Sequence, residues 1–143
     1  MNDAEKETRL HLKSAPARVI LALNGILHLY YGFVFLADPR AMMASLSLSA
    51  LNPAGITEMR AFHGGLMLAM GCLFSLASLY KRFIIAGLIM MTVTYAGAVA
   101  ARTTGIILDQ TNDALIFQIL YIEIAGLILG LTGLWIEKKT ENY

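Results

Sequence analysis

The chain has 143 residues, of which 57% are hydrophobic and only 15% are charged, and its mean hydropathy is +0.64. Soluble domains carry about 25% charged residues, and here the apolar residues come in long blocks. This composition excludes an ordinary soluble domain, and the lack of alternating segments of about ten residues excludes a transmembrane β-barrel. We therefore predict an integral membrane protein with an all-α fold. The single cysteine, Cys72, is predicted to be a small core residue.

Four apolar blocks are long enough to cross a hydrocarbon core of roughly 30 Å, which takes about 20 helical residues. The first follows Pro16 and stops before Asp38-Pro39, because proline is tolerated at the start of a helix and disrupts its interior. We predict one four-helix transmembrane bundle over residues 17–136, with tails at 1–16 and 137–143. The predicted spans cover residues 17–37, 58–80, 83–101 and 113–136.

The connections between the predicted spans differ in length and character. Residues 38–57 form a long outer connection that is apolar but contains several serines, and it is broken at Asn52-Pro53. It is either an interfacial half-helix or an ordinary surface loop. Lys81-Arg82 is so short a turn that the second and third spans should form an antiparallel hairpin. Residues 103–112 are predicted to be a short polar connection.

The basic residues indicate the orientation in the membrane. Eight of the eleven Lys and Arg residues lie in the two tails, at the start of the first span or in the 81–82 turn. Lys and Arg in short loops mark the cytoplasmic side, so both termini are predicted to be cytoplasmic. We expect a multi-pass protein of the bacterial cytoplasmic (inner) membrane. Because these charges follow the topology, nucleic-acid binding is not expected.

One carboxylate, Glu123, lies inside the last apolar block. A charge near the centre of a bilayer costs roughly 2.5–3.5 kcal/mol on insertion scales, so it is usually paired or functional. Glu123 shares a helix face with Gly126 and Gly130, a GxxxG pattern that allows a neighbouring backbone to approach closely. We expect Glu123 to point into the bundle, and we expect Gly64 and Gly65 to pack in the same way in the second span.

Polar side chains from all four predicted helices fall in the outer half of the bundle, whereas the inner half carries no charge. Their depths follow from the rise of about 1.5 Å per residue, which places Glu123 level with His28. We predict that they form an outward-facing polar cluster. The candidate ligand-binding residues are Asn24, His28, Arg60, His63, Tyr95, Arg102 and Glu123.

Several segments of the chain carry a family resemblance. EMRAFHGGLMLAMG (residues 58–71) resembles the signature segment of a bacterial membrane family, the family of domain of unknown function 4345. NGILHLYYGFVFLADP (24–39) is similar to its first helix, and ARTTGIILDQ (101–110) to its Arg-x-x-Gly turn. Glu123 stands where that family has an acidic residue in its last helix. The sequence departs from the family at His63, where Tyr is expected, and at Gln110, where Gly is common.

The resemblance implies a small four-helix membrane protein, similar to the quinone-linked DoxX-like proteins. It implies no established activity and no catalytic residues, and it leaves the cofactor unknown.

Four functional interpretations remain open. In the first, the cluster is structural: Glu58 or Glu123 pairs with Arg60 or Arg102 and fixes the helix register in a non-catalytic accessory or scaffold protein. In the second, the cluster is a pocket that binds a lipophilic molecule such as a quinone or a lipid. A proton or ion relay lacks titratable groups in the inner half. A metal site lacks ligand spacings such as HxxE, HxxxH or CxxC.

Of the four interpretations, we predict that the cluster is structural, and we do not expect an enzyme. The partners we predict are the lipid bilayer and a second copy or another membrane protein, bound through the small-residue helix faces. One such face in the second span carries Ala61, Gly65 and Ala69.

Overall fold

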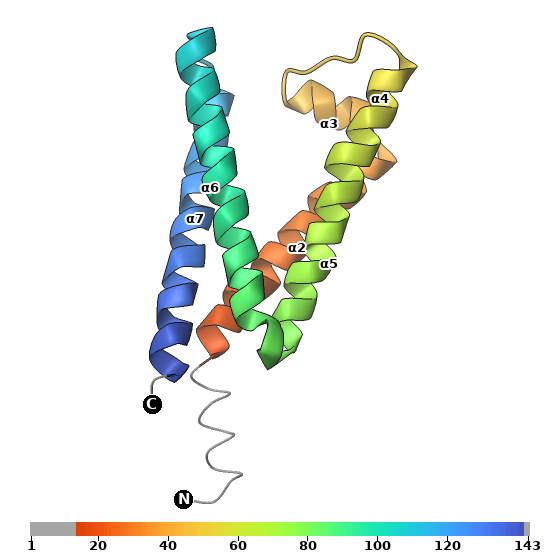
Figure 1. Cartoon of the computed structure of the whole chain (residues 1–143). Helices are drawn as coiled ribbons and strands as arrows, with labels where there is room; N and C mark the ends of the chain where they lie inside the picture. Colours follow the sequence, from red (N-terminus) through yellow and green to blue (C-terminus); the bar gives the residue numbers. More distant parts are fainter. Residues whose placement is uncertain (1–13, 142–143) are drawn as a thin grey trace, which may run out of the picture. The chain divides into compact units, whose positions relative to one another are not determined.

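The computed structural model describes residues 14–141 (Figure 1). These residues are mostly helical and contain no strand, which confirms the predicted all-α fold. In chain order the elements are α2 (Ala15–Ala37), α3 (Pro39–Ser45), α4 (Pro53–Met59), the π-helix η1 (Arg60–Gly65), α5 (Leu66–Leu79), the 3₁₀-helix η2 (Lys81–Phe83), α6 (Ile84–Asp109) and α7 (Ala114–Glu141). The tail predicted at residues 1–16 lies mostly outside the described residues.

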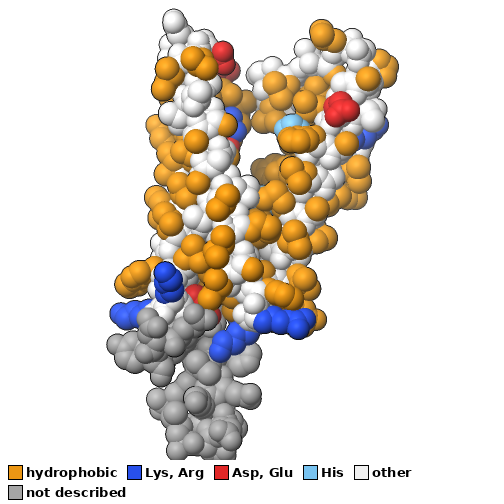
Figure 2. Space-filling view, viewed as in Figure 1, with side chains coloured by type: hydrophobic (Ala, Val, Ile, Leu, Met, Phe, Trp, Pro, Cys, Tyr) orange, Lys and Arg blue, Asp and Glu red, His pale blue; other side chains and the backbone are white. Residues whose placement is uncertain are grey.

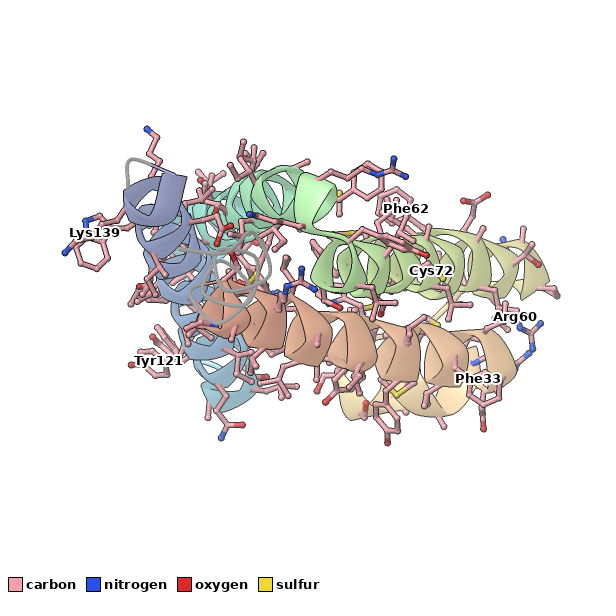
Figure 3. All side chains as sticks on the ribbon, turned by 90° about the horizontal axis from the view of Figure 1, so that it is seen from below. Phe33, Arg60, Phe62, Cys72, Tyr121 and Lys139 are labelled. Atoms are coloured by element: carbon pink, nitrogen blue, oxygen red, sulfur yellow. The ribbon has the colours of Figure 1, made fainter. Side chains whose placement is uncertain are left out.

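Four helical stretches are long and apolar enough to cross a membrane, which confirms the four predicted spans. They are Ala15–Ala37, Pro53–Leu79, Lys81–Asp109 and Ala114–Lys139. Large apolar side chains are exposed along them, including Phe33, Phe62 and Tyr121, and Figure 3 shows these three pointing away from their helices. Such side chains suit contact with lipid tails. The protein is therefore a multi-pass integral membrane protein.

The helix starts follow from local sequence. The side chain of Asp38 caps α3 by accepting a hydrogen bond from the backbone N–H of Ala41 at 3.0 Å. Asn52 caps α4 by accepting from the N–H of Gly55 at 3.0 Å. In both cases proline follows the cap, at the first helical position where no backbone donor is needed. Asp38-Pro39 therefore ends α2 and at once begins α3, so the long outer connection contains a short helix.

Two helix ends carry a residue in the left-handed conformation. At the end of α3, Ser47 has φ 57°, and the N–H groups of Ser47 and Leu48 bond to the carbonyls of Ala44 and Met43 at 3.1 and 2.8 Å. This pattern is a Schellman motif. At the end of α6, Gln110 has φ 51° and ψ 36°. Here α6 continues eight residues beyond the predicted end of the third span, and the polar connection shrinks to residues 110–113.

The structure comprises two compact units, one formed by residues 14–21 with 77–141 and the other by residues 22–76. In the first, α6 and α7 pack side by side along their lengths (Figure 1). Its core contains Leu21, Ile84, Leu88 and Met91, each 0% exposed. Figure 2 shows Lys and Arg side chains gathered at one end of this pair, where α6 begins and α7 ends.

In the second unit, α2 and α5 pack through glycines spaced by seven residues. A Cβ on Gly25 would lie 2.9 Å from the backbone N of Ser75, and one on Gly71 would lie 2.7 Å from the backbone N of Leu29. A Cβ on Gly32 would meet the backbone N of Leu68 at 2.7 Å. The two backbones therefore touch, and only glycine fits at these positions.

Gly64 belongs to the same seam, because a Cβ there would lie 3.1 Å from the backbone N of Leu36. Its neighbour Gly65 lies on another face: the nearest atom to a Cβ there is Arg60 O of its own helix, at 3.9 Å.

The prediction that Cys72 is a core residue was wrong, because this side chain is exposed (Figure 3). Successive helical positions are turned by about 100°, so adjacent residues serve different faces.

Candidate functional site

The buried carboxylate of Glu123 is paired with Arg102 between α7 and α6. Arg102 Nε donates to Glu123 Oε2 at 2.8 Å, and Arg102 Nη2 donates to Oε1 at 2.6 Å. Glu123 is 8% exposed, and the Arg102 side chain is 26% exposed. This bidentate fork is the strongest form of a carboxylate–guanidinium contact. Both carboxylate oxygens are occupied by one side chain of the same chain.

The depth of the pair follows from the length of the helices. Glu123 lies nine residues after the start of α7, or about 13 Å along its axis. Arg102 lies seven residues before the end of α6, or about 10 Å from it. The sequence placed Arg102 at the membrane surface because α6 was expected to end at residue 101. The longer helix instead carries Arg102 to the level of the carboxylate.

The glycine face of α7 brings α6 close enough for this pairing. A Cβ on Gly126 would lie 2.6 Å from Tyr95 Cζ, so the ring of Tyr95 lies directly on that glycine. A Cβ on Gly130 would lie 2.6 Å from Thr92 Oγ1. Tyr95 is 9% exposed and packs one helical turn from Glu123. The phenol, the guanidinium and the carboxylate thus form one cluster on the α6–α7 pair.

Asn24 and His28 lie together in the other unit. His28 Nδ1 donates to the carbonyl of Asn24 one turn earlier in α2, at 2.9 Å, because a carbonyl can only accept. The imidazole meets the ring of Phe74 of α5 edge to face, with 5.1 Å between the centroids. Both polar residues are buried, each 7% exposed. This His is held as part of the α2–α5 packing.

His63 and Arg60 both lie in the π-helix η1 and contact α2. The His63 ring lies 5.1 Å from the ring of Phe35 and 5.8 Å from that of Phe62. Its Nδ1 is buried and has no hydrogen-bond partner among residues 14–141. Arg60 Nε donates to the carbonyl of Leu36 at 3.2 Å, and so satisfies one of the last carbonyls of α2. π-Helical turns are frequent at functional sites.

Two polar contacts of the α6–α7 unit were absent from the candidate residues. Ser14 Oγ donates to Glu137 Oε1 at 2.8 Å, and Glu137 is 3% exposed. Arg18 Nη1 donates to the carbonyls of Ser78 and Leu79 at 3.2 and 3.0 Å, at the end of α5. From its position at the start of the first span, Arg18 was predicted to be a topological charge only. No local pattern links residues about 60 or 120 positions apart, so these contacts could not be read from spacing.

No three His, Cys, Asp or Glu side chains of residues 14–141 come together in a group that could hold a metal ion. The notable polar features of the described residues are therefore the Arg102–Glu123 pair, the two histidines, and the hydrogen bonds of Ser14 and Arg18.

The fold and these contacts define a four-span membrane protein with a buried ion pair between its last two helices. The sequence model of a domain of unknown function, DUF4345, matches residues 16–134. The chain belongs to this family, as its signature segments indicated. No curated protein and no solved structure shows significant similarity to it.

Proposed function

We propose that the protein is a non-catalytic accessory or scaffold protein of the membrane, in which buried polar groups hold the helices in register. The observation that carries this proposal is the bidentate Arg102–Glu123 pair. Arg102 donates to both oxygens of Glu123, and Glu123 is only 8% exposed, so the charge of the carboxylate is balanced within the α6–α7 pair. Charge pairs fixed between two helices are best attested as devices that set register.

The orientation and the partners belong to the same proposal. Both termini lie in the cytoplasm, as the distribution of eight of the eleven basic residues supports. A partner helix or second copy binds the face formed by Ala61, Gly65 and Ala69. All three are exposed, and a Cβ at Gly65 would come no closer than 3.9 Å to another atom, the carbonyl oxygen of Arg60. The glycine face of α7 is already covered by α6.

The test compares single and double replacements of the ion pair. Glu123→Gln leaves Arg102 without its charged partner, and breaking a buried pair costs about 3–5 kcal/mol. The double variant Arg102→Met with Glu123→Leu removes both charges and keeps similar volumes, so its stability should equal or exceed that of the wild type. Unfolding by SDS in mixed micelles, followed by circular dichroism, measures both effects.

A second readout separates a structural role from a chemical one. Native mass spectrometry of each variant, purified in mild detergent, reports the molecules that stay bound. Under the proposal, the folded double variant keeps every bound mass of the wild type. A folded double variant that loses a bound molecule would show that the pair belongs to a ligand site, and would contradict the proposal.

One observation favours a second function, the binding of a lipophilic molecule beside His63. Its Nδ1 is buried, unpartnered within residues 14–141, and flanked by the rings of Phe35 and Phe62. Buried polar atoms normally have a partner, and a ligand carbonyl such as that of a quinone would provide one. His63→Phe keeps the ring packing and removes the nitrogen. It should abolish quinone retention, as measured by extraction and ultraviolet absorbance, while the unfolding midpoint stays unchanged.

A further inference from the structure

A small hollow lies within the unit of residues 22–76, beyond the Ala37 end of α2. It measures about 200 Å³ and is lined by Arg40, Met43, Leu48, Ser49, Ala50 and Ile56. Sites for whole drug-sized ligands measure roughly 300–1,000 Å³. The hollow is therefore too small for a whole drug-sized ligand or lipid, and a molecule of that size could place only part of itself inside.

The position of the hollow fixes the surroundings of its opening. α2 ends at Ala37 and α4 begins at Pro53, and both belong to stretches that can cross a membrane. The hollow is built from the segment between these two ends and from Ile56 in the first turn of α4, so it lies at the level where a span leaves the hydrocarbon. Lipid phosphates and glycerol groups occupy this interfacial level.

The lining divides into a polar part and an apolar part. Arg40 supplies a guanidinium and Ser49 a hydroxyl, and both residues are exposed. Met43 and Ile56 are 4% and 8% exposed and form an apolar floor. On the same segment Leu48 is 47% exposed and Leu51 is 99% exposed, so two leucines are presented to the surroundings. An Arg and a hydroxyl above an apolar floor suit a phosphate attached to a glycerol ester.

We propose that this hollow binds the phosphate and glycerol of a membrane phospholipid whose acyl chains lie in the bilayer. The charges near the hollow determine whether it distinguishes anionic from zwitterionic headgroups. Residues 38–60 carry Arg40, Arg60, Asp38 and Glu58, two positive and two negative. Their net charge of zero favours neither anionic nor zwitterionic headgroups, so the recognised group is the phosphate that both share.

The test uses the full-length protein in mild detergent and native mass spectrometry with added lipid. The probes are phosphatidylglycerol, phosphatidylethanolamine and diacylglycerol with the same acyl chains, together with inorganic phosphate. We expect the two phospholipids to bind with similar affinity, and diacylglycerol at least about tenfold more weakly, because it lacks the acceptor for a charge-assisted hydrogen bond. Inorganic phosphate at millimolar concentration should leave the bound phospholipid in place.

Two variants assign the binding to this hollow. Arg40→Gln should weaken both phospholipids about tenfold and leave diacylglycerol unchanged. Ser49→Ala should give a smaller loss in the same direction. The matched control is Arg82→Gln. Arg82 is an exposed arginine in η2, between the second and third spans, and this variant should bind the phospholipids as the wild type does. Both lining residues are exposed, so unchanged unfolding midpoints are expected for all three variants.

Three results would overturn the proposal. Equal binding of diacylglycerol and phospholipid would show that the phosphate is not recognised. Equal losses in Arg40→Gln and Arg82→Gln, or none in Arg40→Gln, would show that the lipid binds elsewhere. Displacement of the phospholipid by inorganic phosphate would assign the hollow to a soluble anion.

Discussion

The glycine seam between α2 and α5 makes a quantitative prediction when Gly71 is compared with Gly97. Both are glycines within long helices, so Gly→Ala at either site gains about 1 kcal/mol from helix propensity. At Gly97 no atom lies within 4 Å of the added Cβ. Gly97→Ala should therefore stabilise the protein by about 1 kcal/mol.

At Gly71 the same methyl group has no room. The added Cβ would lie 2.7 Å from the backbone N of Leu29 and 3.0 Å from the carbonyl of Gly25. Backbone atoms cannot move aside as a flexible side chain can, and overpacking costs typically about 1–3 kcal/mol. The gain in helix propensity offsets about 1 kcal/mol of this overpacking cost. Gly71→Ala should therefore destabilise the protein by up to about 2 kcal/mol.

The measurement is unfolding in mixed micelles, in which SDS is titrated into protein in mild detergent and helicity is followed by circular dichroism. The two variants carry the same chemical change, so effects of the change itself on helix formation cancel in the comparison. The predicted outcome is a shift of the midpoint in opposite directions. If Gly71→Ala stabilised the protein as much as Gly97→Ala does, the backbones of α2 and α5 would not be in contact and the seam would be refuted.

Two other substitutions test the helix end of α6 and the exposed small-residue face. Gln110→Gly should raise the free energy of unfolding by about 1 kcal/mol. Glycine adopts the left-handed conformation of Gln110 (φ 51°) without the cost that a side chain brings. An unchanged or lower SDS midpoint would contradict this reasoning. Gly65→Leu should leave the monomer as stable as the wild type but abolish association with a second copy or partner, as seen by chemical cross-linking in membranes. Gly64→Leu is the matched control. The introduced leucine would meet the backbone of α2 at Leu36, so this variant should lower the SDS midpoint of unfolding. Equal stability losses in both variants would contradict the assignment of the two faces.

The left-handed Gln110 bears on one departure noted in the family resemblance. The resemblance led us to expect glycine at this position, and the structure shows a conformation that glycine adopts most easily. The chain keeps the turn with glutamine in its place. The resemblance therefore pointed to a backbone requirement that the residue itself does not reveal.

Local sequence determined the class of protein and the number of its helices. The long apolar blocks predicted four spans, because the cost of leaving backbone groups unpaired in lipid allows only helices for such blocks. Asp38 and Asn52, each followed by proline, marked the breaks around the outer connection. These features act over a few residues, so their effect can be read without knowing what lies opposite.

The position of Arg102 shows where local reasoning failed. The third span was predicted to end at residue 101, with a polar connection after it. The helix continues to Asp109, and within it the charge of Arg102 is neutralised by Glu123, a residue on the next helix. The neutralisation of this charge therefore depends on a contact that periodicity does not encode.

The apolar surroundings of Glu123 were enough to predict that it would be buried on a glycine-lined face, since a lone charge in an apolar helix must avoid lipid. They were not enough to predict which arginine pairs with it, because Arg60 and Arg102 were equally available in the sequence. Arg102 is the partner because Tyr95 and Thr92 of α6 lie directly on Gly126 and Gly130, and this contact brings the guanidinium to the carboxylate. Arg60 instead binds the last turn of α2. Composition determines that a charge needs a partner, and the packing of helix against helix determines which partner is within reach.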